Sequence, residues 1–591
     1  MELTRVFDLM DYYLETFGDK PDAFAGKVNG KWEKWSFVRF VETAHELAAG
    51  LIGEGIKRGD LIAILANNRP EWNVVDFGAQ LAGAILVPVY PTIAEADLAF
   101  ILGDSEAKIV FVSSKEIFQK TKLASRDLPV QPRLFSFDKI DGANSWTEIL
   151  EKGKANKQTE IINANKKEIQ PDECFTILYT SGTTGTPKGV MLTHRNLVSN
   201  FIDLCDLPPV DHTSRALSFL PLNHIYERML SFLYLFKGPS IYYAESLDTI
   251  SADINELKPH IFTCVPALVQ KVYNRITSKG AELKGIKRAL FFWSVRLAEK
   301  YDVGPNENGW WYKLQLSIAS RLVFSKWREG LGGNVRAMIS GGAALDQRLA
   351  RIFWAAGIPV LEGYGLTETS PVIAVNNFEK NSLRFGTVGP VIRDVIVKFA
   401  EDGEVLVKGP NVMKGYFKRP EATAEVIDSE GYFHTGDIGI MVENRFLKIT
   451  DRKKEIFKTA GGKYIAPQHI ENLLKNSRFI DQSMSIGENR KYPTALIVPA
   501  FAFVREWANR KGIKIGETNE ELVNNPEVVK RINLSIEKLN ASLAQYEKVK
   551  KIVLLPTAWT VEKGELTPKL SLRRKVILKE NEAIIEKLYQ D

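Results

Sequence analysis

The segment Tyr179–His194 constrains this chain more than any other part of the sequence. It reads Y-T-S-G-T-T-G-T-P-K-G-V-M-L-T-H, and so combines glycines, a row of hydroxyl side chains and a lysine. Glycine lets the backbone come close to an anion, hydroxyls donate hydrogen bonds, and Lys188 adds a point charge. The segment therefore predicts a loop that holds a polyphosphate.

The flanking sequence places this loop at the end of a strand. Residues 174–180 (C-F-T-I-L-Y-T) are typical of a buried strand, and residues 190–192 are apolar again. Thr193 is suited to cap a helix that begins near Arg195. Since open α/β sheets bind ligands at their strand ends, we expect the phosphate site there.

Two other interpretations of the loop are less favoured. A Walker-type P-loop needs a hydroxyl directly after its lysine, but Lys188 follows Pro187 and precedes Gly189. An ordinary Gly/Thr turn is the usual explanation of a short glycine-rich stretch. Four hydroxyls, three glycines and a lysine in one loop favour a phosphate site.

The segment resembles the signature loop of the AMP-forming, adenylate-forming superfamily, which contains acyl-CoA synthetases, adenylation domains of peptide synthetases and firefly-type luciferases. The resemblance implies ATP and Mg²⁺ as cofactors, and Lys188 as a catalytic residue that also binds the nucleotide. It implies nucleotide contacts from Thr180, Ser181, Gly182, Thr183, Thr184 and Gly185, with Thr184 also near the metal.

A second glycine-rich segment also follows a predicted strand, and it resembles the second signature of the superfamily. Residues 363–371 read G-Y-G-L-T-E-T-S-P. The resemblance implies that Gly363, Tyr364 and Gly365 bind the nucleotide, with the Tyr364 ring stacked on adenine. It also implies that Thr367 contacts the α-phosphate and that Glu368 holds Mg²⁺. Mg²⁺ prefers oxygen ligands and takes few of them from protein, which agrees with this assignment. A capped turn is the alternative for this stretch taken alone.

Three further pieces of the nucleotide site are implied by the resemblance. The backbone of Gly341, Gly342 and Ala343, in the stretch S-G-G-A-A-L, lines the adenine pocket in relatives. Asp437, in H-T-G-D, is assigned to the ribose hydroxyls, and Arg452 to ribose or phosphate. Structural salt bridges are the competing explanation of the last two residues.

The stretch P-L-N-H-I-Y-E-R, residues 221–228, resembles the long-chain fatty acyl-CoA synthetase branch. By that resemblance His224 is a catalytic residue near the fatty carboxylate and the α-phosphate, although a lone histidine is more often structural. Residues 265–274 (V-P-A-L-V-Q-K-V-Y-N) resemble the same branch, with Ala267 in place of the usual arginine.

The catalytic lysine that the resemblance implies near the C-terminus does not fall at the expected position of the motif. Residues 566–574 read L-T-P-K-L-S-L-R-R, so the expected lysine position falls on Ser571 and a lysine occurs at Lys569. Two residues along an extended strand face the same way, so Lys569 is a candidate substitute. Relatives also imply a hinge at Asp451 to Lys454, and a CoA path along Gly461, Gly462 and Lys463.

Composition sets the remaining limits. The chain has 591 residues, 45% hydrophobic content and a net charge of +6, which suits a multidomain enzyme and does not indicate nucleic acid. Cys174, Cys205 and Cys264 are widely spaced in apolar runs, as expected for reduced thiols in the cytoplasm. With no secretory signal or membrane-spanning stretch, any membrane contact is expected to be peripheral. Trp310 and Trp311 lie on basic, helical-looking sequence, where core packing competes with a membrane contact.

The predicted fold class is α/β. Short apolar strands alternate with amphipathic helices up to about residue 371, which indicates parallel-sheet α/β subdomains, and shorter strands then favour a small β-barrel-like subdomain. The predicted domains are a large AMP-binding (adenylation) domain at 1–450, a hinge at 451–454 and a small mobile α+β domain at 455–591.

These features predict a long-chain fatty acid:CoA ligase that uses ATP, Mg²⁺ and CoA and forms acyl-AMP and pyrophosphate. A fatty acyl-AMP ligase or an acyl carrier protein loader would share the adenylation residues. A nucleotide or acyl sensor without catalysis is a third hypothesis, and a luciferase-like oxygenase has no support beyond the shared motifs. Acyl chain length and oligomeric state are not readable from the sequence.

Overall fold

The computed structural model describes residues 3–181, 186–246, 248–303, 309–560, 563–566 and 572–590. The chain forms two compact units. Unit 1 comprises Met1–Lys398, Leu406–Thr435 and Met441–Leu447; unit 2 comprises Phe399–Val405, Gly436–Ile440 and Lys448–Asp591. The predicted hinge residues 451–454 belong to unit 2, and their role stays a prediction.

Unit 1 contains two eight-stranded sheets. The first has the order β15-β14-β13-β12-β10-β11-β1-β2 and the second β18-β9-β8-β4-β3-β5-β6-β7. The strands of the first sheet are β1 (Phe24–Val28), β2 (Lys31–Trp35), β10 (Arg215–Ser218), β11 (Ser240–Tyr243), β12 (Ile261–Cys264), β13 (Ala337–Ser340), β14 (Val360–Gly365) and β15 (Val372–Val375). Those of the second are β3 (Leu61–Leu65), β4 (Ile85–Pro88), β5 (Ile109–Val112), β6 (Arg133–Ser136), β7 (Asn144–Ser145), β8 (Cys174–Ser181), β9 (Pro187–Thr193) and β18 (Gly415–Tyr416).

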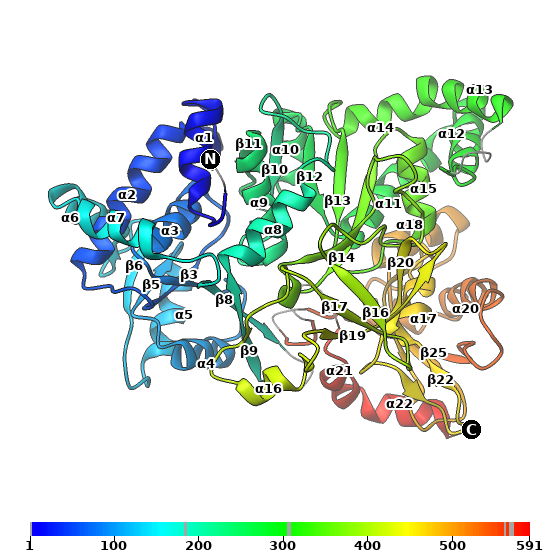
Figure 1. The fold of residues 1–591 in the computed structure, drawn as a ribbon. Helices are drawn as coiled ribbons and strands as arrows, with labels where there is room; N and C mark the ends of the chain where they lie inside the picture. Colours follow the sequence, from blue (N-terminus) through cyan, green and yellow to red (C-terminus); the bar gives the residue numbers. More distant parts are fainter. Residues whose placement is uncertain are drawn as a thin grey trace. The chain divides into compact units, whose positions relative to one another are not determined.

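The parallel α/β organisation predicted from the apolar runs is confirmed. Strands β3, β4 and β5 pair in parallel in one sheet, and β10, β12, β13 and β14 pair in parallel in the other. Apart from the end of β14, these strands are buried at all but at most one residue each, because helices cover both faces of the sheets. Figure 1 shows α8 and α9 running between the two sheets of unit 1.

The helices of unit 1 connect these strands. They are α1 (Asp8–Phe17), α2 (Phe37–Gly53), α3 (Pro70–Leu81), α4 (Glu95–Ser105), α5 (Lys115–Ser125), α6 (Trp146–Ala155), α7 (Thr159–Glu168), α8 (His194–Leu204), α9 (Ile225–Lys237), α10 (Ile250–Leu257), α11 (Pro266–Glu282), α12 (Gly285–Ala298), α13 (Trp310–Ala319), the π-helix η1 (Ser320–Phe324), α14 (Ser325–Gly330), α15 (Gln347–Ala355), the 3-10 helix η2 (Thr367–Thr369) and α16 (Pro420–Ala424).

The shorter strands that follow form a four-stranded sheet in the order β16-β17-β19-β20. These strands are β16 (Ile396–Phe399), β17 (Glu404–Lys408), β19 (Phe433–Val442) and β20 (Phe446–Arg452). The region expected as a small β-barrel-like subdomain is therefore a sheet with β16 and β20 at its two ends.

The rest of unit 2 has mixed α and β structure, as the α+β prediction for the last part of the chain requires. It contains a two-stranded sheet and a three-stranded sheet in the order β23-β24-β25. The elements are β21 (Phe457–Lys458), β22 (Tyr464–Ile465), α17 (Pro467–Leu474), β23 (Ile480–Ile486), β24 (Thr494–Pro499), α18 (Phe501–Lys511), α19 (Asn519–Val523), α20 (Pro526–Asn540), β25 (Lys551–Leu554), α21 (Arg574–Glu580) and α22 (Glu582–Tyr589). One face of α20 is buried, with Val528, Ile532 and Ile536.

A buried ion pair fixes helix α9 to the second sheet. The Arg228 side chain is 1% exposed, and its Nε donates to Oδ2 of Asp76 in α3 at 2.7 Å. A second guanidinium nitrogen of Arg228 donates to the hydroxyl of Thr176 in β8 at 2.7 Å. Since β8 leads into the glycine-rich loop, this guanidinium sets the position of α9 against the strand that carries the loop.

The residue before it fixes α9 to the first sheet. Glu227 is buried, and its carboxylate accepts a hydrogen bond from the hydroxyl of Thr263 in β12. Burial raises the pKa of Glu227 to about 7. Consecutive charged residues of one helix thus connect the two sheets of unit 1.

Removing one partner of the buried pair should be costly. Arg228→Met leaves Asp76 charged and unpaired in the interior, so we expect the free energy of unfolding to fall by about 3–5 kcal/mol. Joint replacement with Asp76→Leu should recover most of this loss. Urea denaturation measures both. Arg126→Met, which breaks an exposed pair with Asp127, is the control and should change the urea midpoint little, because solvent screens that pair. A cost for Arg228→Met no larger than that of the control would contradict a structural role for the pair.

Candidate active site

The first glycine-rich segment is a hairpin between two strands. β8 and β9 pair antiparallel, with Thr180 opposite Lys188 and Ser181 opposite Pro187. Thr193 caps α8 as predicted, since its side chain accepts from the backbone N–H of Asn196. Gly182, Thr183, Thr184 and Gly185, which the resemblance assigns to the nucleotide, lie outside the described residues.

Lys188 and Glu368, one from each signature, meet at a common side chain. The short strand β18 pairs with β9 and places Tyr416 opposite Val190. The Nζ of Lys188 lies 5.0 Å from the centroid of the Tyr416 ring, and the Tyr416 hydroxyl donates to Oε1 of Glu368 at 3.0 Å. Tyr416 therefore contacts a cation through its ring and a carboxylate through its hydroxyl group.

Asparagine side chains hold the backbone around the second signature. The Nδ2 of Asn411 donates to the carbonyl oxygens of Thr369 and Val372, and Asn200 of α8 both donates to and accepts from the backbone of Val372. The backbone N–H of Met413 donates to the carbonyl oxygen of Glu368 at 2.8 Å. These bonds tie the turn that carries Glu368 to the helix that follows the first signature.

The two other glycine-rich segments leave neighbouring strands. β13 and β14 are parallel partners, with Ser340 opposite Glu362, so the stretch that contains Gly341, Gly342 and Ala343 and the stretch from Gly363 to Gly365 begin side by side. Gly342 has a positive φ of 83°, which glycine adopts without strain. The two segments therefore lie next to each other, and their shared adenine pocket stays a prediction.

A buried carboxyl links these two segments. Oε1 of Glu362, the residue before Gly363, accepts a hydrogen bond from the backbone N–H of Leu345 at 2.8 Å. Burial raises the pKa of Glu362 to about 8. A mostly protonated carboxyl group therefore lies beneath the predicted adenine pocket near neutral pH.

His224 is the N-cap of α9. Its Nδ1 accepts a hydrogen bond from the backbone N–H of Tyr226 at 3.0 Å, and its ring packs edge-on against Tyr90. The ring of Tyr226 fills the space beside Gly341, where a Cβ would lie 3.1 Å from it. His224 therefore has a structural role as a helix cap. It also lies near the glycine-rich segment that follows β13, so this position is compatible with the predicted catalytic role.

Asp437 and Arg452 lie together in unit 2. Asp437 is buried on β19, and its Oδ1 accepts from Nε of Arg452, at the end of β20, at 3.1 Å. The Arg452 side chain is half-exposed. The salt bridge considered as the alternative to ligand binding is therefore present in this structure.

The predicted hinge and CoA path also lie in unit 2. Asp451 is buried, accepts from the backbone N–H of Arg452, and has its pKa raised to about 7 by burial, whereas Lys454 is exposed in a turn. Gly461, Gly462 and Lys463 form the turn between β21 and β22, where the backbone N–H of Thr459 donates to the carbonyl of Lys463.

The candidate lysine near the C-terminus, Lys569, lies outside the described residues, as does Ser571. The flanking residues Leu566 and Leu572 form an antiparallel bridge. Just beyond, Arg574 is paired with Glu455 and Glu471, which fixes the start of α21 close to the residues that follow the predicted hinge.

Comparison with known proteins agrees with this arrangement. The model of the AMP-binding enzyme family matches residues 14–417, and that of the AMP-binding enzyme C-terminal domain matches residues 455–591. The chain belongs to the AMP-binding enzyme family. It is 32% identical to long-chain-fatty-acid–CoA ligase FadD15 of Mycobacterium bovis, over 94% of this chain and 92% of that protein. It is 31% identical to human long-chain-fatty-acid–CoA ligase 1, over 100% and 87% of the two chains.

Solved structures show the same fold. The A domain of carboxylic acid reductase from Segniliparus rugosus, in complex with AMP and a carboxylic acid, matches with a TM-score of 0.75 and 21% identity, over 99% of this chain and 94% of that one. The anthranilate CoA ligase AuaEII, in complex with anthranoyl-AMP, matches with a TM-score of 0.71 and 16% identity, over 98% of each chain. Within the AMP-binding enzyme family, the relatives above place this chain in the branch of long-chain fatty acid–CoA ligases.

A magnesium ion brought by a nucleotide is compatible with the residues of this AMP-binding enzyme. Glu368 offers a partly exposed carboxylate whose second oxygen is not engaged by Tyr416. In the part of the chain that the structure describes, no group of three or more His, Cys, Asp and Glu could hold a resident metal. Mg²⁺ commonly takes one or two protein carboxylates and completes its shell with phosphate oxygens and water.

Three contacts at the site were not predicted from the sequence. Tyr416, Glu362 and Asn411 each act through a partner distant in sequence, so no local pattern marks them. Tyr416 follows a glycine in the stretch K-G-Y-F-K, where a pair of adjacent aromatic residues is the only signal available.

The raised pKa of Glu362 predicts how stability varies with pH. Its ordinary pKa of 4.5 is raised to about 8 by burial, so the folded state binds a proton that the unfolded state releases. The stabilisation is complete below pH 4.5 and is lost as the pH rises through 8. Glu362→Gln keeps an acceptor for Leu345 and cannot ionise, so its urea midpoint should fall less than that of the wild type between pH 5 and pH 8.

The matched control is Glu151→Gln, which changes an exposed carboxylate. It should keep the pH dependence of the wild type. Identical pH dependence in the Glu362→Gln variant and the wild type would contradict the buried, protonated state of Glu362.

Proposed function

We propose that this chain is a long-chain fatty acid–CoA ligase that uses ATP, Mg²⁺ and CoA. It activates a fatty acid as acyl-AMP with release of pyrophosphate, and then transfers the acyl group to CoA. The observation that carries the proposal is the contact of Lys188 and Glu368 with one ring, that of Tyr416, which joins the two signature segments.

The first step is an in-line attack of the fatty carboxylate oxygen on the α-phosphorus of ATP. A P–O bond forms, the bond to pyrophosphate breaks, and no proton has to be removed because the acid is already ionised at neutral pH. The barrier is therefore charge repulsion and orientation, which cationic and hydrogen-bonding groups lower. Lys188 supplies a cation, Glu368 would hold the Mg²⁺ that screens the phosphates, and Tyr416 keeps both in place.

In the second step the CoA sulfur attacks the acyl carbon and AMP leaves with the bonding electrons, while the thiol proton passes to the surroundings. The remaining site residues are proposed for these steps by their match to the motifs. They are Thr180 to Gly185, Gly341 to Ala343, Tyr364, Thr367, Asp437 and Arg452 for the nucleotide; His224 for the carboxylate; Asp451 and Lys454 for the hinge; and Gly461 to Lys463 for the CoA path. Lys569 is the proposed C-terminal lysine of adenylate formation.

Separate assays of the two steps test the function and the role of Lys569. With Mg²⁺, ATP and a long-chain fatty acid, the protein should release pyrophosphate and form AMP, and it should form a thioester when CoA is added. Lys569→Ala should reduce adenylate formation at least about 100-fold, as expected for loss of a transition-state cation, and should leave thioester formation from supplied acyl-AMP nearly unchanged. Lys563→Ala, in the same part of unit 2, is the control.

Equal losses in both half-reactions would contradict the role of Lys569. Thioester formation with a phosphopantetheinyl carrier protein and none with CoA would instead favour the carrier-loading alternative.

We further propose that unit 1 contacts membranes through α13 and η1. Trp310 is 77% exposed and Trp311 58% exposed, so the alternative of core packing does not hold for these two side chains. Leu314, Ile318 and Leu322 continue the exposed apolar stripe at helical spacing. The inner face of α13 is also apolar, since Ala319 is buried and Tyr312 and Leu316 pack against the hydrophobic core. A helix that is apolar on both sides, with one side uncovered, suits an interfacial position in lipid.

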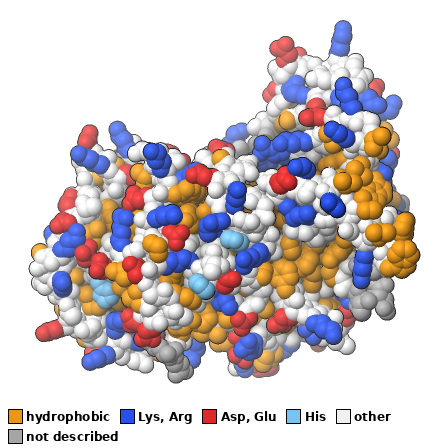
Figure 2. All heavy atoms as spheres, turned by 90° about the horizontal axis from the view of Figure 1, so that it is seen from above, with side chains coloured by type: hydrophobic (Ala, Val, Ile, Leu, Met, Phe, Trp, Pro, Cys, Tyr) orange, Lys and Arg blue, Asp and Glu red, His pale blue; other side chains and the backbone are white. Residues whose placement is uncertain are grey.

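The charge around this stripe favours an anionic lipid surface. Residues 283–298 and 309–328 each contain four basic residues and no acidic one. Exposed Ile286 lies in the first of these stretches beside Lys287. Figure 2 shows hydrophobic side chains lying among Lys and Arg side chains on this face of the molecule. None of the described helices is long and apolar enough to cross a membrane, so the contact proposed here is peripheral.

Liposome binding tests this contact. The double variant Trp310→Ala/Trp311→Ala should bind liposomes of phosphatidylcholine and phosphatidylglycerol at least about 10-fold more weakly, because two large aromatic anchors are lost. Its thioester formation with a short, water-soluble acid should not change. Ile161→Ala, which removes an exposed apolar side chain on α7, is the matched control. Unchanged co-sedimentation of the double variant would remove the proposal.

A further inference from the structure

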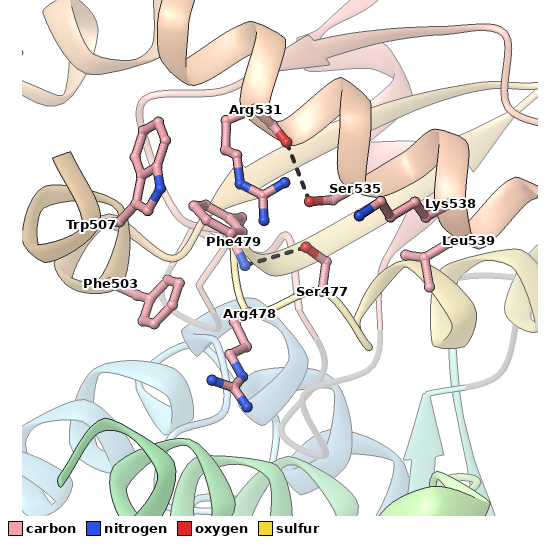
Figure 3. A pocket seen from close by; sticks show the side chains of 9 residues that line it. All are labelled: Ser477, Arg478, Phe479, Phe503, Trp507, Arg531, Ser535, Lys538 and Leu539. Atoms are coloured by element: carbon pink, nitrogen blue, oxygen red, sulfur yellow. Dashed lines mark hydrogen bonds between the residues drawn. The ribbon is translucent and has the colours of Figure 1, made fainter. Parts of the chain in front are cut away.

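Unit 2 contains a pocket of about 440 Å³ that no residue of the proposed catalytic machinery lines. Its walls come from the turn between α17 and β23, from α18 and from α20. The lining residues are Ser477, Arg478, Phe479, Phe503, Trp507, Arg531, Ser535, Lys538 and Leu539. Figure 3 shows Phe479 and Arg531 near the centre, with Phe503 and Trp507 on one side and Lys538 and Leu539 on the other.

Side chains from one face of α20 and from α18 line much of this pocket. Arg531, Ser535, Lys538 and Leu539 follow one another at helical spacing on α20, so they share one face. The neighbouring face of α20, with Val528, Ile532 and Ile536, is buried in the core of unit 2, and Leu539 packs against the edge of that core. Phe503 and Trp507 are one turn apart on α18.

Aromatic rings form a rigid wall. The rings of Phe503 and Trp507 both meet Phe479 edge-on, with centroid distances of 5.1 Å and 5.5 Å. The guanidinium carbon of Arg531 lies 4.4 Å from the centroid of Phe479. Phe479 is buried while Phe503 and Trp507 are partly exposed, so flat apolar surface borders the pocket.

Within the described part of the chain, the cations of the pocket have no anionic partner. Arg478, Arg531 and Lys538 line it, and no carboxylate does. Among the described residues, none of these cations forms an ion pair with an acidic side chain, whereas other arginines of unit 2, such as Arg490 and Arg574, do. Like charges that converge on one pocket repel unless an anion neutralises them.

We propose that this pocket binds a phosphorylated nucleoside, with phosphate oxygens on the cations and the base against the aromatic wall. Guanidinium groups match phosphate oxygens in geometry, and base–aromatic stacking contributes about 1–3 kcal/mol. A volume of about 440 Å³ is in the range of small-molecule sites and accommodates one nucleotide. A fatty acid would also match the cations, but the chain would lack an apolar tunnel, since charged and polar side chains make up more than half of the lining residues.

Two sources of this ligand exist if the chain is a CoA ligase, namely free adenine nucleotides and the nucleotide end of CoA. The site itself does not rest on the proposed function. A nucleotide bound in this pocket would contact unit 2 alone. It would be distinct from the ATP that reacts with the fatty acid, whose predicted contacts include Lys188, Tyr364 and Glu368 in unit 1.

Hydrogen–deuterium exchange of the full-length protein tests the proposal. The probes are AMP, adenosine 3′,5′-bisphosphate, adenosine and pyrophosphate, each at about 1 mM, which half fills a site with a Kd of that order. AMP or the bisphosphate should slow exchange in peptides from α18 and α20, and adenosine should not. Protection by the bisphosphate alone would identify the nucleotide end of CoA as the source. Peptides from the two signature segments report the reacting nucleotide separately, so failure of one site leaves the other measurable.

Variants separate the two parts of the site. Arg531→Gln/Lys538→Gln should weaken nucleotide protection at least about 10-fold. Trp507→Leu should weaken protection by the nucleotide and leave that by pyrophosphate unchanged. Lys530→Gln, an exposed change on another face of α20, is the control. Unchanged exchange in β24 shows that each variant is folded.

The proposal is overturned if no phosphorylated probe slows exchange in α18 and α20. It is also overturned if the Arg531→Gln/Lys538→Gln variant is protected like the wild type. A third outcome would also contradict nucleotide binding. If pyrophosphate and AMP protect equally, and Trp507→Leu does not change this protection, the pocket binds anions without recognising the base.

Discussion

The guanidinium of Arg228, buried against Asp76 and Thr176, is the interaction on which the geometry of unit 1 depends. Charges are rarely buried because desolvation is expensive, and the pair is tolerated only because its geometry satisfies both groups. It connects α9 to β8, and Glu227, the residue before it, connects α9 to β12 of the other sheet. One helix therefore relates the strand that carries the phosphate loop to the sheet that carries the second signature. His224 caps the start of this helix, so its position follows from the same pair.

The site combines rigid supports with groups suited to anions. Lys188 and Glu368 have opposite charges and would attract each other directly, yet the described contacts run through Tyr416, which contacts both. A lysine that stays off the carboxylate remains available for a phosphate, and a carboxylate that accepts from a tyrosine hydroxyl still has an oxygen for a metal ion. This arrangement suits a reaction that needs charge neutralisation and orientation rather than a protein nucleophile. The asparagine side chains of Asn200 and Asn411 hold the surrounding backbone, and because they carry no charge they do not compete with the phosphates for Lys188.

Much of the fold was readable from the sequence because its determinants are local. Apolar runs such as residues 61–66 and 261–265 are buried parallel strands, and the amphipathic run Phe37–Gly53 forms α2. The signature segments were recognisable because glycines, hydroxyls and a lysine are close together in sequence. Tyr416 and Glu362 were missed because their roles depend on strand pairing with distant residues, which a single sequence does not encode locally. Trp310 and Trp311 were ambiguous for the same reason, since only the packing of α13 decides which of its apolar faces is covered. The roles of Lys569 and of the hinge stay predictions.

The central claim is that the fatty carboxylate attacks the α-phosphorus of ATP. Oxygen-18 in the carboxylate of the acid tests this most directly, because the attacking oxygen stays with the phosphorus when CoA displaces AMP. The account predicts one labelled oxygen in AMP and none in pyrophosphate, as measured by mass spectrometry of the products. Label in inorganic phosphate together with formation of ADP, or AMP that carries no label, would contradict it.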